Sequence, residues 1–236
     1  MEKKVASFYK EATRVVDKGL RQYMLSVFSY MSGGLALTAA VAYLVSCSPS
    51  LMAILFNNLF VFMLVALAPM GLSFYLAARL ARISVEKAKA LFFIYASSLG
   101  ISLASIFVVY SGTSIANTFF VTSSMFLSMV IYGYVTEKDL TAFGSFLLMG
   151  LLGIIISSII NLYTKSSAFM FVISVLAVVI FTGLTAYDAQ RIKNYYLEAD
   201  SVEVNEKKSI LGALHLYLDF INLFLSLLRI IGTRRD

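Results

Sequence analysis

Between Arg21 and Arg79 the chain contains no aspartate, glutamate, lysine or arginine. A helix needs about 20 apolar residues to cross the hydrocarbon core of a bilayer, so this run is long enough to cross twice. The 236 residues are 60% hydrophobic and only 14% charged, with a mean hydropathy of +0.85. Membrane β-strands are excluded, because they would show segments of about 10 residues with alternating polarity, whereas these runs are continuous. The sequence therefore predicts an all-α, polytopic integral membrane protein.

Seven segments are long and apolar enough to span a membrane. Short polar or charged connections separate them, and no shift in composition marks a second domain. We therefore expect an N-terminal tail at residues 1–22, followed by a single seven-helix transmembrane domain at residues 23–233. The expected spans are 23–46, 57–79, 88–110, 114–135, 141–163, 167–190 and 210–230.

The distribution of lysine and arginine predicts a cytoplasmic N-terminus. With this orientation, all but four of the 19 basic residues lie in the N-terminal tail or in loops on the cytoplasmic side. The exceptions are Lys165, Arg229, Arg234 and Arg235, three of which end or follow the seventh span. Either the C-terminus lies outside despite its arginines, or the last segment re-enters the membrane and returns.

The net charge of +6 indicates a lipid bilayer as partner and requires no nucleic acid. Anionic lipid headgroups attract a basic cytoplasmic face, and no base-stacking or phosphate-cradling motif accompanies the charge. Cys47 is the only cysteine and His215 the only histidine. An internal disulfide, a cysteine metal cluster and a zinc site are therefore not expected, and neither is a tightly bound cofactor.

A stripe of polar residues runs along the seventh span. Its members are His215, Asp219, Asn222, Ser226 and Arg229, at spacings of 4, 3, 4 and 3. At 3.6 residues per turn these spacings place all five residues on one face of a helix. An ionised aspartate near the centre of a lipid-exposed helix costs roughly 2.5–3.5 kcal/mol. We therefore expect this face to turn into the bundle or toward a hydrated cavity.

A second carboxyl, that of Asp188, lies near the cytoplasmic end of the sixth span. Asp219 enters from the same side at a depth of roughly 14 Å, taking 1.5 Å per residue, so the two carboxyls can meet. In a poorly hydrated site they would share one proton and titrate as a coupled unit. Loss of that proton would make the pair repel, loosen the two helices and offer oxygen ligands for transient binding of Ca²⁺. The two aspartates are thus the candidate ion pathway and pH sensor.

Simpler roles for these residues stay open. Asp188 can be an interfacial residue that pairs with Arg191 three positions later. Asp219 can be a structural partner of Asn222 or of a basic residue. Asn222 itself is either that partner or a residue that modulates the pathway.

The stretch FTGLTAYDAQRIK at 181–193, followed by GALHLYLDFINLFLSLLRI at 212–230, resembles the paired signature of the Bax inhibitor-1 family of membrane proteins. SGTSIANTFFVTSSMF at 111–126 and YGYVTEKDLTAFGSFLLMGLLGIII at 132–156 resemble the bacterial branch of that family. The resemblance extends over residues 20–233. It implies a bundle in which the seventh helix is central, and a pH-sensitive calcium leak channel of the bacterial inner (plasma) membrane.

The resemblance also implies roles for single residues. The two pore aspartates of the family match Asp188 in the AYD motif and Asp219 in the LYLDF motif. Its gating arginine, at the end of the second helix, matches Arg82 or Arg79, and either side chain is near enough to the membrane surface to reach a carboxylate. His215 departs from the small polar residue expected there. It adds a titratable group one turn from Asp219 and suits either helix packing or modulation of the pH response.

Two other functions fit parts of the pattern. Two aspartates on adjacent spans, the first in a Tyr-Asp pair, also resemble an intramembrane aspartyl protease. Such proteases place Gly-x-Gly before the second aspartate and carry a Pro-Ala-Leu segment, and this sequence has neither. We therefore expect no enzymatic activity. The alternative to a leak is a non-enzymatic regulator that binds other membrane proteins, such as a quality-control protease, through the N-terminal tail and residues 191–208.

Overall fold

The computed structural model describes residues 2–235, with side chains described from Lys18 onward. All regular secondary structure in these residues is helical, which confirms the predicted all-α class. The elements are α1 (Glu2–Ser46), α2 (Pro49–Asn57), α3 (Leu59–Arg79), the 3₁₀ turn η1 (Leu80–Arg82), α4 (Val85–Leu103), α5 (Ile106–Val109), α6 (Gly112–Val135), α7 (Thr141–Thr164), α8 (Ser167–Tyr195) and α9 (Val202–Ile231).

Seven helical segments within the described residues are long and apolar enough to cross a membrane, as predicted. They are α1 from Lys18 onward, α3 with η1, α4 with α5, and then α6, α7, α8 and α9 singly. α1 is continuous from Glu2, so no break in the helix separates the expected tail from the first span. The third span, expected to be unbroken, is interrupted after Leu103 because Ala104 N–H donates to Ile101 O, an i−3 bond that tightens and ends α4.

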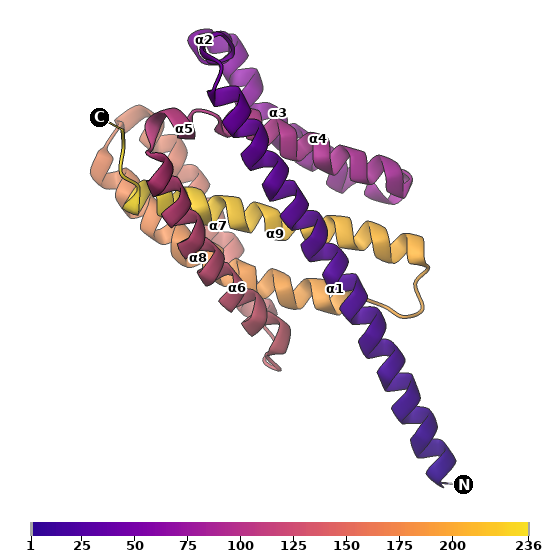
Figure 1. Ribbon diagram of the computed structural model, residues 1–236. Helices are drawn as coiled ribbons and strands as arrows, with labels where there is room; N and C mark the ends of the chain where they lie inside the picture. The colour runs from indigo at the N-terminus through magenta and orange to yellow at the C-terminus, as the bar shows by residue number, and fades with distance from the viewer. Residues whose placement is uncertain (1, 236) are drawn as a thin grey trace.

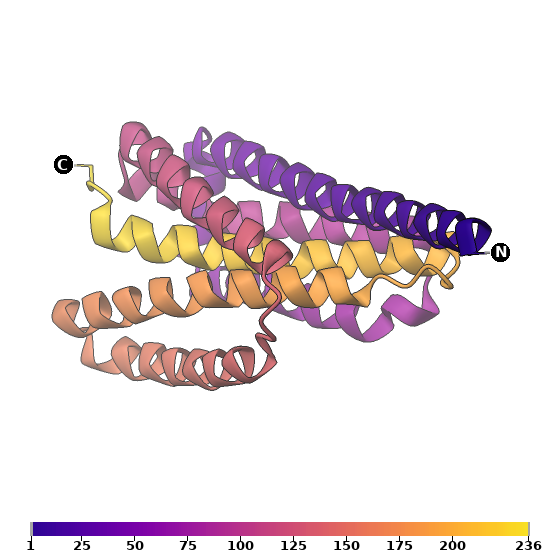
Figure 2. The same ribbon diagram turned by 90° about the horizontal axis from the view of Figure 1, so that it is seen from below.

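α9 is the most buried of the seven spans. In its most apolar stretch 67% of the residues are buried, against 39% for α8 and less for the others. It packs along α8, α1, α6 and α4, and Figure 2 shows it lying between α1 and α8. The seventh helix is therefore central in the bundle, which its polar stripe required.

One glycine lets α6 and α8 cross at close range. A Cβ atom at Gly133 on α6 would overlap the carbonyl group of Ala186 on α8. Small residues at such a crossing allow two backbones to approach closely, which is a common way for membrane helices to associate. The contact brings α6 against the part of α8 that carries Asp188.

Serine side chains fix where several of the spans begin. Each accepts a hydrogen bond from a backbone N–H three residues later and so satisfies one of the free donors of the first helical turn. The capping residues are Ser84 before α4, Ser111 before α6, Ser166 before α8 and Ser201 before α9. These serines lie in the short connections between apolar runs. They therefore fix the residue at which each of these helices begins.

The two chain ends lie at opposite ends of the bundle, as Figures 1 and 2 show. The C-terminal segment is held there by backbone hydrogen bonds: Arg235 N–H donates to Val109 O at 2.9 Å and Ser111 N–H donates to Thr233 O at 3.2 Å. Thr233 N–H also donates to Ser114 Oγ at 2.8 Å. α9 is one continuous helix from Val202 to Ile231, which favours a single crossing over a re-entrant last segment. We call the two ends of the bundle the N-terminal end and the C-terminal end.

Candidate functional site

Asp188 and Asp219 lie against each other between α8 and α9. Their carboxyls are near enough to interact with each other, which agrees with the expectation that the two side chains can meet. Asp219 is only 5% exposed, and the side chain of Asp188 is 14% exposed. α8 and α9 are packed along each other over this region, so the pair forms part of the interface between two spans.

A hydrogen bond between the two carboxyls would require a proton. Ionised carboxylates only accept hydrogen bonds, and Asp219 Oδ2 is buried without any donor partner among the described residues. Two unprotonated carboxylates so close together in a poorly hydrated interface would repel strongly. If one of the two were protonated, it could donate a hydrogen bond to the other, and the pair would then titrate as a single unit.

Two basic groups lie on the Asp188 side of the pair. Arg191 Nη1 is 3.9 Å from Asp188 Oδ1, three positions along the same helix, and Arg191 Nε also donates to Tyr195 Oη at 2.6 Å. His215, partly buried on α9, is near enough to Asp188 to interact with it electrostatically. Asp188 thus makes both contacts that the sequence had left as alternatives, one with Arg191 and one with Asp219.

The rest of the polar stripe on α9 leads from Asp219 toward the C-terminal end. Asn222 Nδ2 donates to Leu218 O at 2.8 Å, and Ser226 Oγ donates to Asn222 O at 2.7 Å. These bonds satisfy the two side chains within their own helix. Asn222 is therefore placed next to the carboxyl pair without binding it, and the stripe turns toward a cavity.

That cavity, of about 410 Å³, lies between α7, α8 and α9 in the half of the bundle nearer the C-terminal end. Asn222, Ser226 and Arg229 line it from α9, and mostly apolar side chains of α7 and α8, together with Ser158 on α7, form the other walls. We call it the α7–α9 cavity. It is the place where the polar stripe emerges from the buried interface.

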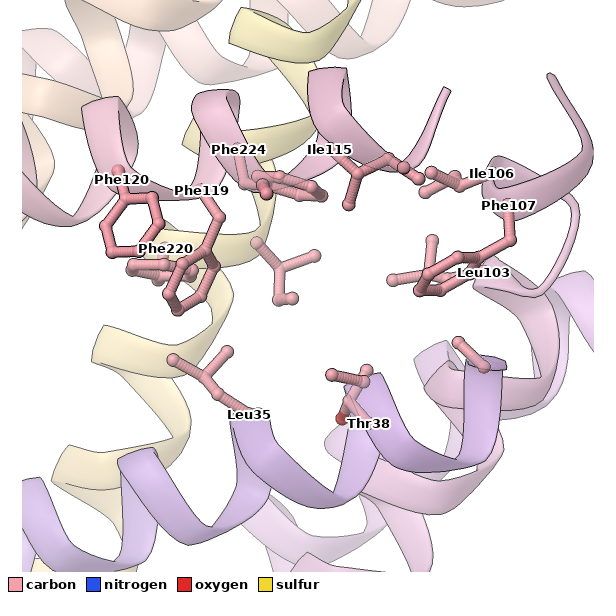
Figure 3. Close-up of a pocket in the computed structure, with 15 residues that line it drawn as sticks. Leu35, Thr38, Leu103, Ile106, Phe107, Ile115, Phe119, Phe120, Phe220 and Phe224 are labelled. Atoms are coloured by element: carbon pink, nitrogen blue, oxygen red, sulfur yellow. The ribbon is translucent and has the colours of Figure 1, made fainter. Parts of the chain in front are cut away.

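A second cavity, of about 390 Å³, lies on the other side of α9 and is lined by α1, the end of α4, α5, α6 and α9. Figure 3 shows phenylalanine, leucine and isoleucine side chains around it, with the hydroxyl oxygen of Thr38 near its lower edge. That hydroxyl is already paired with Tyr217 Oη at 2.6 Å. No charged side chain lines this cavity, so it offers no ligands to an ion.

Arg79 and Arg82 form no ion pair with the two aspartates. Arg79 ends α3 and Arg82 ends η1, and both are exposed without an ion pair to the described residues. η1 itself packs on α9, which leaves Arg82 at the N-terminal end of the bundle near the helix that carries Asp219. The arginine beside the carboxyls is Arg191.

A polar cluster at the N-terminal end was not found from the sequence. Lys89 Nζ on α4 lies 2.7 Å from Glu206 Oε1 on α9, and Tyr30 Oη on α1 donates to the same oxygen at 2.7 Å. The cluster joins three spans. Each charge is separately visible near the edge of an apolar run, but no spacing rule connects positions so far apart in the chain.

The carboxyl pair does not make a metal site of the usual kind. Among the side chains described from Lys18 to Arg235, no group of three or more histidine, cysteine, aspartate or glutamate residues is placed to hold a metal. Ca²⁺ takes about 6–8 oxygen ligands, so an ion at Asp188 and Asp219 would keep most of its water or use backbone carbonyls. Such a site suits an ion in passage better than a resident one.

Comparison with known proteins places the chain in a family. The family model described as "Inhibitor of apoptosis-promoting Bax1" matches residues 20–236. The chain is 44% identical over 223 residues to RP147 of Rickettsia prowazekii, covering 94% of each protein. It is 45% identical over 219 residues to the inner membrane protein YbhL of Escherichia coli K12, covering 92% of this chain and 94% of YbhL. A protein of Borreliella burgdorferi is 46% identical over 216 residues, covering 91% and 93% respectively. The chain belongs to the Bax inhibitor-1 family of membrane proteins.

Proposed function

We propose that this protein is a pH-sensitive calcium leak channel in which the Asp188–Asp219 pair is the proton sensor. The observation that carries the proposal is the contact of two carboxyls inside a membrane-spanning helix interface, one of them with an oxygen that has no donor partner among the described residues. Ionisable groups in such a position are costly and usually serve function.

The proposed mechanism begins with the shared proton. While the proton is present, the pair holds α8 and α9 together. When it leaves, two unit charges at ~4 Å repel by about 4 kcal/mol at an effective dielectric constant of ~20. That repulsion is large enough to separate the helices locally and to expose carboxylate oxygens. Calcium flux should therefore rise as the pH rises.

Neighbouring groups set the pH at which this happens. Arg191, 3.9 Å from Asp188, stabilises the ionised form of that carboxyl. The side chain of Arg191 is partly exposed at the N-terminal end of the bundle, so the pair should respond to the pH on that side. His215 adds a second titratable group within electrostatic range of Asp188. We propose Arg82 and Arg79 as more distant modulators of the pathway from that end.

The proposed location is the bacterial inner membrane, with the N-terminus in the cytoplasm. The name of the relative YbhL gives that membrane for a protein 45% identical to this chain. The excess of lysine and arginine in the N-terminal segment and the loops of the N-terminal end supports the orientation.

The test is a calcium flux assay on purified protein in liposomes loaded with a calcium indicator, between about pH 6 and 8. The wild type is compared with the Asp188→Asn/Asp219→Asn double variant. Flux that rises with pH in the wild type and loses its pH dependence in the double variant supports the proposal.

Two results would overturn it. Equal pH profiles in the wild type and the double variant would remove the carboxyl pair as the sensor. Absence of flux at every pH would remove the channel itself and favour the regulator, which should then co-purify with another membrane protein through residues 191–208 whether or not the aspartates are intact.

A further inference from the structure

From the α7–α9 cavity we infer that this chain has a binding site for an anionic phospholipid, with an acyl chain between α7 and α9 and its phosphate at Arg229. The inference does not depend on the proposed ion flux. It rests on the walls of the cavity, on its opening toward the bilayer and on the charge at its end.

The walls suit a hydrocarbon chain. α7 packs along α8, and α8 packs along α9, so the cavity lies over α8 with α7 and α9 as its sides, an order that Figure 2 shows. Aliphatic residues from α7 and the buried Phe181 from α8 line it. Its volume of about 410 Å³ is within the range of small-molecule sites, roughly 300–1,000 Å³.

The cavity opens toward lipid. Three of its α7 residues, Ile155, Ile159 and Leu162, are 48%, 52% and 72% exposed and so belong also to the outer surface of a membrane span. In a bilayer this surface is surrounded by acyl chains. A cavity continuous with that surface and walled by aliphatic side chains is therefore accessible to an acyl chain from the side.

Arg229 supplies the recognition of a headgroup. It lies in the last turn of α9, is exposed, lines the cavity and has no acidic partner within ion-pair distance among the described residues. Arginine binds phosphate with a planar, bidentate arrangement of donors. α9 ends two residues after Arg229, so in a bilayer that this helix spans the guanidinium would lie near the depth of the lipid phosphates.

Among the described residues, the charges at this end of the bundle are all basic. The C-terminal end of the bundle carries four basic residues, which are Lys165, Arg229, Arg234 and Arg235. The acidic residues within residues 2–235 lie toward the N-terminal end or at Asp219, inside the bundle. Basic residues near a bilayer surface attract anionic lipid, so this unbalanced end complements a negatively charged headgroup.

A role of this cavity as the outer part of a cation path is less consistent with its structure. Its walls are mostly aliphatic and open to hydrocarbon, and its one charged lining residue, Arg229, would repel a cation. Asn222 and Ser226 already donate hydrogen bonds within α9. The acyl chain of a lipid can pack against the apolar walls and its phosphate can bind the arginine. A hydrated calcium ion can do neither.

The experiment uses tryptophan fluorescence, since the natural sequence contains no tryptophan. Phe181→Trp places a reporter in the cavity wall, and Phe126→Trp places one at a similarly buried position that does not line it, with exposures of 7% and 5%. The variants are reconstituted in zwitterionic vesicles that contain a small fraction of phospholipid with brominated acyl chains, which quench tryptophan on contact. The brominated lipid has an anionic phosphatidylglycerol headgroup in one series and a zwitterionic headgroup in the other.

The expected result is quenching of Phe181→Trp, with little quenching of Phe126→Trp, and a preference of about fivefold for the anionic brominated lipid. Adding Arg229→Gln should reduce that preference to near one. Adding Arg235→Gln removes an equal charge from the same end but not from the cavity lining, and should leave most of the preference.

The inference is overturned if Phe181→Trp is quenched no more than Phe126→Trp, because no acyl chain then enters the cavity. It is also overturned if both brominated lipids quench equally with Arg229 intact, which would mean non-specific bilayer contact. Should Phe181→Trp not fold, native mass spectrometry of the otherwise unaltered protein decides the matter. Anionic lipid should stay bound through detergent exchange and be lost in Arg229→Gln but not in Arg235→Gln, and equal retention in both variants would refute the site.

Discussion

Glu206 Oε1 on α9 lies 2.7 Å from Lys89 Nζ on α4, and the same oxygen accepts a 2.7 Å hydrogen bond from Tyr30 on α1. One carboxylate therefore joins three spans at the N-terminal end of the bundle. The side chains of Lys89 and Glu206 are 36% and 31% exposed, so solvent weakens the ion pair.

Removing this carboxylate should have a small effect on global stability. Glu206→Gln should lower the free energy of unfolding by about 1 kcal/mol or less, because an exposed ion pair contributes little. Tyr30→Phe should cost about 1 kcal/mol for its lost hydrogen bond. Unfolding followed by circular dichroism in mixed detergent measures both. Because both contacts use the same carboxylate, the double variant should lose less free energy of unfolding than the sum of the two single losses. A loss equal to that sum would show that the two contacts act independently, which contradicts the shared-carboxylate geometry.

Asp219→Asn should fix the carboxyl pair in its closed form. The amide of asparagine donates a hydrogen bond to Asp188 without needing a proton, and no second negative charge forms when the pH rises. Calcium flux at about pH 8 should then fall to the level seen at about pH 6. The liposome assay measures it. A variant whose flux still rises with pH like that of the wild type would assign the pH response to another group.

Asp139 offers a control carboxyl outside the spans. The hydroxyl and the backbone N–H of Thr141 donate hydrogen bonds to it, which lower its pKa below the ordinary value of 3.8. Because the folded-state pKa is lowered, its stabilising effect is complete above the unfolded pKa and is lost only as the pH falls through the lower, folded value. Asp139→Asn should therefore leave the flux profile between about pH 6 and 8 unchanged. A shifted profile would show that removing any carboxylate at this end changes the response.

Arg191→Gln should move the onset of calcium flux to higher pH. Without the guanidinium 3.9 Å away, the ionised form of Asp188 loses a stabilising charge and the shared proton is held more tightly. Arg191→Lys keeps the charge and should shift the profile less. Arg82→Gln should have a smaller effect than Arg191→Gln, and Arg79→Gln the smallest. The flux assay ranks the four variants, and a larger shift at Arg82 would mean that its exposed side chain reaches the pair during opening.

Replacing Gly133 by alanine and replacing Gly153 by alanine should change the free energy of unfolding by very different amounts. At Gly133 the added methyl group overlaps the carbonyl of Ala186, so Gly133→Ala should cost about 1–3 kcal/mol as α6 and α8 move apart. At Gly153 on α7 nothing lies within 4 Å of the added carbon, so Gly153→Ala should be neutral or stabilising by up to about 1 kcal/mol. Denaturant titration in detergent micelles compares them. Equal stabilities would mean that the α6–α8 crossing adjusts freely.

Much of this architecture is predictable because the bilayer imposes it. A run without charge between Arg21 and Arg79 requires two crossings, and the 4, 3, 4, 3 spacing on the last span requires a buried face. The same reasoning predicted that Asp188 and Asp219, which enter from the same side on neighbouring spans, can meet, and the structure brings their carboxyls near each other. Their role as sensor stays a prediction.

The parts that were not predicted depend on which helices are neighbours. The Lys89–Glu206–Tyr30 cluster joins α4, α9 and α1, and hydropathy carries no information about that arrangement. The break after Leu103 is equally invisible to hydropathy, because α5 is as apolar as the helix before it. The α7–α9 cavity arises because α7 packs along α8 and stands away from α9, which is a feature of helix packing alone.

The backbone bonds between Thr233, Arg235 and the segment 109–111 also limit how α9 can move. They anchor its last residue beside the start of α6, so α9 cannot slide along its axis as a piston without breaking them. The remaining motion is a swing about that anchored end, in the manner of a lever. Asp219 lies twelve residues, or about 18 Å, from Ile231 along the lever, and Glu206 lies more than twice as far. A small rotation at the C-terminal end would therefore separate the carboxyls moderately and displace the N-terminal end of α9 most.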